Sequence, residues 1–202
     1  QLFFKGSFSI EGNSATSGSG GGIYFENGSV EISSESEASI SLNSAAVSGG
    51  GIYFQSTSAM IDFPFNFRSG IRSNTAGSYG GGVSGENSEI AIARGMLAEN
   101  EAGIAGGAIA LRSDSTLLAE GTTFVDNVAG DGGALFIDGR GRLENSTLFD
   151  NRADARGGGI MLVSPAELSV RSATISGNTA GESGGGVYNN NAVLSIQQTL
   201  VA

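Results

Sequence analysis

The chain has 202 residues, enough for one or two domains with a sizeable core, and 34 of them are glycine, more than twice the usual share. Ten basic residues against 20 acidic ones give a net charge of −10, and no run of Lys or Arg offers a footprint for phosphates, so nucleic acid is not an expected partner. Cysteine and histidine are absent, which excludes disulfides, thiol catalysis, Ser-His-Asp triads and histidine metal ligands.

A three-part motif recurs seven times along the chain. Each copy has an apolar residue three positions before an asparagine, then the triplet Asn-x-Ala, then a glycine pair followed by apolar residues, as in "GGGIYF" at 20–25 and "GGALFI" at 132–137. Successive asparagines lie 24 to 31 residues apart, so the chain consists of repeats of that length. The motif asparagines are Asn13, Asn43, Asn74, Asn100, Asn127, Asn151 and Asn178.

Within each repeat the periodicity is that of short strands. Segments such as "GIYF", "VEIS", "EIAIA", "ELSV" and "VLSI" alternate or run apolar, and Gly, Ser, Asn and Asp separate them. No window carries an apolar stripe with helical spacing. The sequence therefore predicts an all-β, right-handed parallel β-helix of about seven coils with three short strands per coil.

We expect a single β-helix domain over residues 1–202 that starts and ends in the middle of a coil. "LFF" at 2–4 resembles the end of a coil, and "TLVA" at 199–202 stops where the next motif asparagine is due. Both ends would then present open strand edges. Two interpretations stay open: a segment of a longer solenoid, or a subunit that stacks end to end.

The recurrent polar residues have expected structural roles. An asparagine at the same bend of every coil can turn its amide inward and bond the asparagine of the next coil, which gives a ladder along the rod. The glycine pair supplies positive φ or room for close backbone approach. Alanine two positions after the asparagine fits a tight corner.

The combination of apolar-x-x-Asn with Gly-Gly-Ala-Ile resembles the repeat of the chlamydial polymorphic membrane proteins and of the wider polymorphic outer membrane protein repeat family. "FVDN…GGALFI" at 124–137 and "LAEN…GGAIAL" at 97–111 are most similar to it, whereas five copies have Gly-Gly-Gly in place of Gly-Gly-Ala. The resemblance covers essentially the whole chain. It implies the passenger region of an autotransporter or a similar bacterial surface protein, used for adhesion or display.

Three acidic residues precede the motif asparagine in consecutive repeats. They are Glu99, Asp126 and Asp150. Stacked coils would place these carboxylates about 5 Å apart, close enough to repel one another or to share a cation. A solvated column of turn carboxylates is the favoured interpretation; a Ca²⁺ site and the paired carboxylates of a polysaccharide-degrading enzyme are the alternatives. Because the loops are short and build no cleft wall, we expect neither catalysis nor any other cofactor.

Two groups of aromatic residues and one acidic loop complete the candidates. Phe63, Phe65 and Phe67 alternate along one segment, which favours a core face over an exposed ridge. Three tyrosines follow the apolar residue after the glycine pair, so they are expected on the outer face of their strands. These are Tyr24, Tyr53 and Tyr188. The loop "SSESEA" at 33–38 is expected to be a solvated excursion.

Together these features predict a structural and adhesive rod, secreted or displayed on a bacterial cell surface. Its expected partner is a protein or glycan on a host or neighbouring cell, or a second copy stacked end to end in an extracellular filament. A polysaccharide-degrading enzyme centred on Glu99, Asp126 and Asp150 is the alternative from another class. No apolar run approaches 20 residues and Gln1 opens no signal peptide, so no membrane insertion by this segment is expected.

Overall fold

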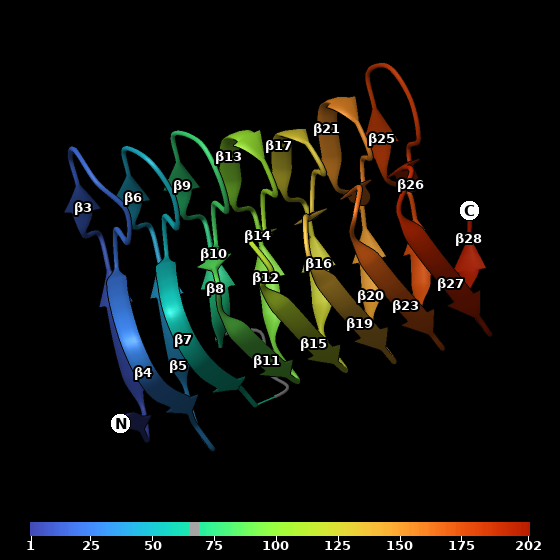
Figure 1. Cartoon of the computed structure of the whole chain (residues 1–202). Coiled ribbons are helices and arrows are strands. Elements are labelled where there is room, and N and C mark those ends of the chain that lie inside the picture. The colour runs from blue at the N-terminus through green and yellow to red at the C-terminus, as the bar shows by residue number, and fades with distance from the viewer. Residues whose placement is uncertain (65–68) are drawn as a thin grey trace.

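A computed structural model describes residues 1–64 and 69–202, and these residues form strands that stack in parallel as a β-solenoid of about seven turns (Figure 1). Every strand pairing in the described chain is parallel, and the pairs join successive turns. The fold class expected from the repeats, an all-β parallel β-helix, is confirmed. Among the described residues, no helix is long and apolar enough to cross a membrane.

The apolar-x-x-Asn segments build an 8-stranded sheet. Its first motif position stacks in register, with Leu97 between Ile71 and Phe124, and all three side chains are buried. The strands, in order, are β2 (Phe8–Glu11), β5 (Ala38–Ser41), β8 (Gly70–Arg72), β12 (Met96–Ala98), β16 (Thr123–Val125), β20 (Thr147–Phe149), β24 (Thr174–Ser176) and β28 (Leu200–Val201).

The residues that follow each asparagine build a 7-stranded sheet. The motif alanine stacks on its equivalents, as Ala102 does on Ala76 and Ala129, because a small side chain fits this corner. The strands are β3 (Ser14–Ala15), β6 (Ser44–Ala45), β9 (Thr75–Ala76), β13 (Glu101–Ala105), β17 (Val128–Asp131), β21 (Arg152–Arg156) and β25 (Thr179–Ala180).

The segments after the glycine pairs build the third sheet, of 13 strands. Two long strands, β4 (Ile23–Ser33) and β7 (Ile52–Asp62), run its full width, and from the third turn each turn contributes two strands separated by a bend. These pairs are β10 (Val83–Glu86) and β11 (Glu89–Ala93), β14 (Ile109–Arg112) and β15 (Thr116–Glu120), β18 (Leu135–Ile137) and β19 (Arg140–Glu144), β22 (Ile160–Val163) and β23 (Glu167–Arg171), β26 (Val187–Asn190) and β27 (Val193–Gln197); β1 (Leu2–Lys5) pairs with β4.

The glycine pair meets two different backbone demands. Gly106 has φ near 69°, which favours glycine, and a β-carbon on Gly107 would overlap the carbonyl oxygens of Gly133 and Val128. The first glycine therefore turns the chain and the second lets neighbouring turns approach closely.

The interior is a set of aliphatic columns along the axis. One column holds Ile32, Ile61, Ile92, Ala119, Leu143 and Val170, all buried. Since buried apolar area is the main stabilising contribution to folding, these columns hold the turns together and leave the outward-facing positions free to vary.

Candidate binding surfaces

The seven motif asparagines form a continuous hydrogen-bonded ladder along the solenoid. In its centre, the Asn127 side-chain amide donates to Oδ1 of Asn151 at 2.9 Å and to the Leu97 carbonyl at 2.9 Å. Its own Oδ1 accepts the side-chain amide and the backbone N–H of Asn100, each at 3.0 Å. The four remaining pairs of consecutive asparagines are each joined by a side-chain hydrogen bond of 2.8–3.0 Å.

The ladder is buried along most of its length. Asn74, Asn100, Asn127 and Asn151 have no exposed surface, whereas Asn13 is exposed. A buried amide without partners is costly, and here each internal amide has donors and acceptors on both sides. From Asn43 to Asn151 the ladder is therefore an internal structural element.

Glu99, Asp126 and Asp150 lie exposed at equivalent bends, each with φ between 52° and 56°. The first and last of these carboxylates lean apart: Glu99 accepts a hydrogen bond from the Ser73 hydroxyl of the preceding turn at 2.9 Å, and Asp150 lies over Gly177 of the following turn. Among the described residues, no group of three or more Asp, Glu, His or Cys side chains is arranged to hold a metal ion. A Ca²⁺ site here stays a prediction, and the geometry gives it no support.

The outward tyrosines form a half-covered network. Tyr24 and Tyr53 stack at 5.2 Å, and the Tyr53 hydroxyl donates to Glu86 at 2.7 Å. Both tyrosines lie on the outer face of their strands, as expected. Tyr24 is 49% exposed there, whereas Tyr53 is only 7% exposed. Burial, reinforced by the bond to Glu86, raises the pKa of Tyr53.

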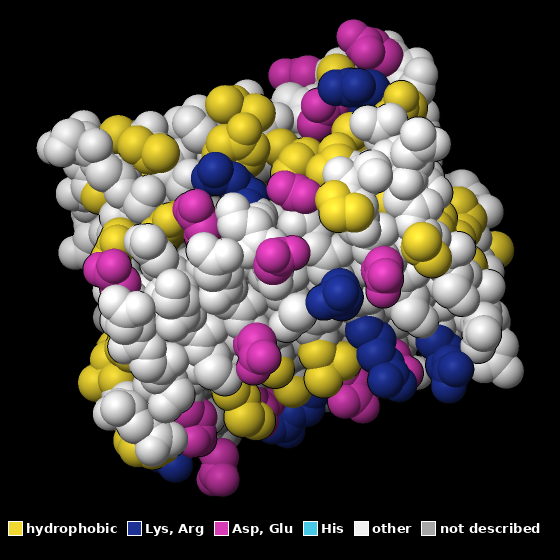
Figure 2. All heavy atoms as spheres, in the orientation of Figure 1, with side chains coloured by type: hydrophobic (Ala, Val, Ile, Leu, Met, Phe, Trp, Pro, Cys, Tyr) yellow, Lys and Arg dark blue, Asp and Glu magenta, His cyan; other side chains and the backbone are white. Residues whose placement is uncertain are grey.

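Two arginines extend this network along the same face. The Arg112 guanidinium lies 4.4 Å from the Tyr79 ring centroid and pairs with Glu86 at 3.9 Å. Farther along, Arg156 binds Asp131 at 2.8 Å and lies over the ring of the half-buried Tyr188; its pKa is raised by the hydrogen bond from its guanidinium to the Asp131 carboxylate. Acidic and basic side chains lie interspersed on the face shown in Figure 2.

The aromatic segment after β7 is described only in part. Phe63 is 1% exposed and belongs to the core, as the alternation favours. Phe65 and Phe67 lie outside the described residues.

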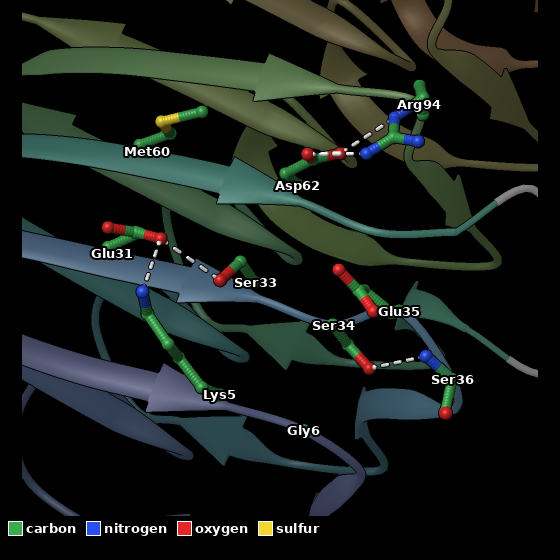
Figure 3. A pocket seen from close by; sticks show the side chains of 10 residues that line it. All are labelled: Lys5, Gly6, Glu31, Ser33, Ser34, Glu35, Ser36, Met60, Asp62 and Arg94. Carbon is green, nitrogen blue, oxygen red and sulfur yellow. Dashed lines mark hydrogen bonds and ion pairs between the residues drawn. The ribbon is translucent and has the colours of Figure 1, made fainter.

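A polar pocket of about 520 Å³ lies where the 13-stranded sheet approaches the 8-stranded sheet, over the first four turns (Figure 3). Two ion pairs lie in it. Lys5 pairs with Glu31 at 3.4 Å, and the Asp62 carboxylate accepts hydrogen bonds from Nε and Nη2 of Arg94. The hydrogen bond that the Arg94 guanidinium donates to Asp62 raises the pKa of Arg94. The exposed side chain of Met60 lines the same pocket.

The acidic loop expected to be a solvated excursion forms one wall of this pocket. Glu35 and Ser36 are exposed, as predicted, but they face the pocket together with Ser33 and Ser34. The Ser34 hydroxyl accepts the Ser36 backbone N–H at 3.1 Å, which fixes the course of the loop.

Residues 7–26 match the family model of the Chlamydia polymorphic membrane protein repeat. This stretch holds Ile10, Asn13 and the first glycine pair, and this combination of apolar residue, asparagine and glycine pair recurs in all seven turns. The resemblance seen in the motif is thereby confirmed, and the match falls on a triple-glycine copy rather than on the two Gly-Gly-Ala copies. No curated protein and no solved structure matches this chain.

Sequence reasoning did not predict the pocket. It also did not predict that Tyr79 and Arg112 belong to the aromatic network. Lys5, Glu31, Asp62 and Arg94 lie on four different turns, and only the register of the turns brings them together. The available signal was the extra length of the loop at 33–38, because insertions in repeat proteins often mark the binding face.

Proposed function

We propose that this chain is a rigid structural rod of a bacterial cell surface whose lateral face binds a protein or glycan of a host or neighbouring cell. The match to the Chlamydia polymorphic membrane protein repeat and the solenoid fold are consistent with such a structural and adhesive role. The role proposed here is non-catalytic.

The contrast between inward and outward columns is the observation that carries the proposal. The inward column through Ile32 and Ile61 repeats aliphatic side chains turn after turn. The adjacent outward column does not repeat: in register it reads Phe3, Glu31, Met60, Ala91, Leu118, Arg142 and Ser169. A constant scaffold with a varied surface suits a molecule whose lateral face carries its specificity.

The test is adhesion of the purified chain to cells. Beads coated with the chain are expected to bind epithelial or bacterial cells in a saturable way, and excess soluble chain should compete. Beads that carry the chain unfolded by heat are the control, since they present the same composition without the register. Equal binding by native and unfolded coats would contradict the proposal.

End-to-end assembly is a second candidate, favoured by exposed apolar side chains on the last two strands. Ile196 is 42% exposed and Val201 is 50% exposed, although they continue the buried columns of Val170 and Ile175. A further coil of the same polypeptide or of a second copy would cover them. Sedimentation velocity over a hundredfold range of concentration tests this candidate. Growing species support a filament, and a single monomeric species contradicts it.

The enzymatic alternative is tested by Asp126→Ala. Asp126 is exposed at its bend, so the variant is expected to fold and to leave adhesion unchanged. Hydrolysis or elimination of acidic polysaccharides by the native chain, lost in this variant, would instead assign catalysis to the carboxylate column.

A further inference from the structure

The corner between the 13-stranded and 8-stranded sheets is enlarged in only two of the described turns. Elsewhere two residues join the strands, such as 94–95 between β11 and β12 and 121–122 between β15 and β16. In the second turn residues 34–37 separate β4 from β5, and in the third turn residues 63–69 separate β7 from β8. The polar pocket lies beside the first of these connections, and Ser34, Glu35 and Ser36 of that connection line it.

The floor of the pocket is a rigid grid of four side chains. Glu31 and Ser33 share the outward face of β4, Met60 and Asp62 share that of β7, and the register pairs Glu31 with Met60 and Ser33 with Asp62. Because β4 and β7 pair residue by residue from Gly28 and Thr57 to Ser33 and Asp62, these groups are held in place before any ligand arrives.

The hydrogen-bonding capacity of the pocket is only partly used. Asp62 accepts two bonds from Arg94, and Glu31 accepts the Ser33 hydroxyl at 3.1 Å and pairs with Lys5. A carboxylate has about four acceptor sites, an ammonium three donors and a guanidinium five. Acceptors and donors therefore remain next to one another, and Met60, 49% exposed, adds an apolar surface beside Glu31.

Charge decides which ligand suits these groups. The pocket holds three carboxylates and two cations, in a chain of net charge −10, so an anion is repelled. A cation would compete with Lys5 and Arg94 for their local partners. A neutral polyhydroxyl ligand donates to the carboxylates, accepts from the cations and leaves both pairs intact.

We propose that this pocket binds a neutral hexose-type unit of a cell-surface glycan, with Glu31 and Asp62 accepting its hydroxyls, Lys5 and Arg94 donating to it, and Met60 contacting its C–H face. The volume of about 520 Å³ lies in the range of small-ligand sites. The inference deepens the proposed adhesive function by naming its ligand class and its place on the lateral face.

Methionine methyl NMR gives a direct test in solution. The chain has three methionines, and Met161, 2% exposed, and Met96, which does not line the pocket, serve as internal references for Met60. The probes are chitotetraose, lacto-N-tetraose and mannotetraose, with a heparin-derived tetrasaccharide as the acidic comparator. We expect the Met60 methyl signal alone to shift, saturably, with at least one neutral probe. No shift with any neutral probe, or a shift with the heparin fragment only, overturns the proposal.

A matched pair of variants assigns the binding to the pocket. Asp62→Asn removes one carboxylate of the floor, and Glu144→Gln removes a carboxylate of the same outward column, also paired with an arginine and almost equally exposed (21% against 22%). We expect the first variant to bind the neutral probe about tenfold more weakly, as loss of a charge-assisted hydrogen bond predicts, and the second to bind it like the native chain. Equal affinities in both variants contradict the site.

The same proteins in the cell-adhesion assay separate the two proposals. Adhesion that persists unchanged in Asp62→Asn, with no sugar-dependent shift of Met60, refutes the pocket and leaves the adhesive role standing, with a protein as the bound partner. A saturable Met60 shift in a chain that does not adhere to cells supports the pocket and refutes the adhesive role.

Discussion

Replacement of Asn127 by alanine tests whether the amide ladder holds the turns together. Asn127 is fully buried, and its Oδ1 is the acceptor for both the side-chain amide and the backbone N–H of Asn100. Its own amide donates to Asn151 and to the Leu97 carbonyl. In the variant, two buried donors of Asn100 lose their acceptor at once, and two acceptors lose a donor.

The expected cost follows from these contacts. An unsatisfied buried donor costs about 1–3 kcal/mol, so the two donors of Asn100 predict a loss of about 2–6 kcal/mol in the free energy of unfolding. Asn13→Ala is the matched control, because Asn13 is exposed and, within the described residues, no group donates to its side chain. The control should lose less than about 1 kcal/mol.

Urea unfolding followed by circular dichroism measures both losses, and hydrogen exchange locates them. In Asn127→Ala the backbone amide of Asn100 should exchange far faster than in the native chain, because its hydrogen bond to Asn127 is absent. A loss in Asn127→Ala within 1 kcal/mol of that in Asn13→Ala, with the Asn100 amide still protected, would refute the ladder as a stabilising element.

Three further predictions concern the close packing of turns, the core and the buried tyrosine. Gly107→Val should abolish folding, because a β-carbon there overlaps neighbouring carbonyls, and loss of the β-sheet circular dichroism measures this. The control Gly18→Ala should fold normally, since nothing lies within 4 Å of its β-carbon position. Phe124→Ala should lose about 3–5 kcal/mol of stability in urea unfolding, and Phe149→Ala, 44% exposed, should lose far less; equal losses would contradict the register of β16 and β20. Because the pKa of Tyr53 is raised in the folded chain, the protonated side chain contributes stability at pH values below about 10, the ordinary tyrosine pKa. This contribution falls as the pH rises above about 10, because the unfolded chain ionises first. Tyr53→Phe should therefore lose less stability than the native chain between pH 10 and 12.

The recurring motif made the scaffold predictable from the sequence. Asn-x-Ala at a spacing of 24 to 31 residues predicts one bend per turn, and the structure has Asn–Asn hydrogen bonds of 2.8–3.0 Å at every step between turns. The same logic places apolar residues such as Leu97 and Phe124 in one buried column. Repeats constrain the inside of the fold because each turn must satisfy the backbone and the side chains of the next.

The outer surface was predictable only in direction. Alternation places Tyr53 on the outer face, but the stacked Tyr24 and the hydrogen bond to Glu86, which bury it, come from neighbouring turns. The lean of Glu99 toward Ser73 likewise depends on a residue of the preceding turn. Spacing along one repeat carries no information on such contacts between turns, so the arrangement of the carboxylate column was not predictable.

The place of the pocket on the rod follows from how a solenoid tolerates change. A substitution at an inward position disturbs the two turns that stack on it, as Ile61 stacks between Ile32 and Ile92, whereas a longer connection at a corner lies outside the stack and leaves the register intact. The loop at residues 34–37 is such a connection, and β4 and β7 beside it are the longest strands of the described chain. Beyond the bend at Asn27 and Ser56, the two strands pair residue by residue up to Ser33 and Asp62, which fixes the floor of the pocket. The ligand site that we propose therefore lies where the fold can hold its geometry, over β4 and β7, beside the loop at residues 34–37.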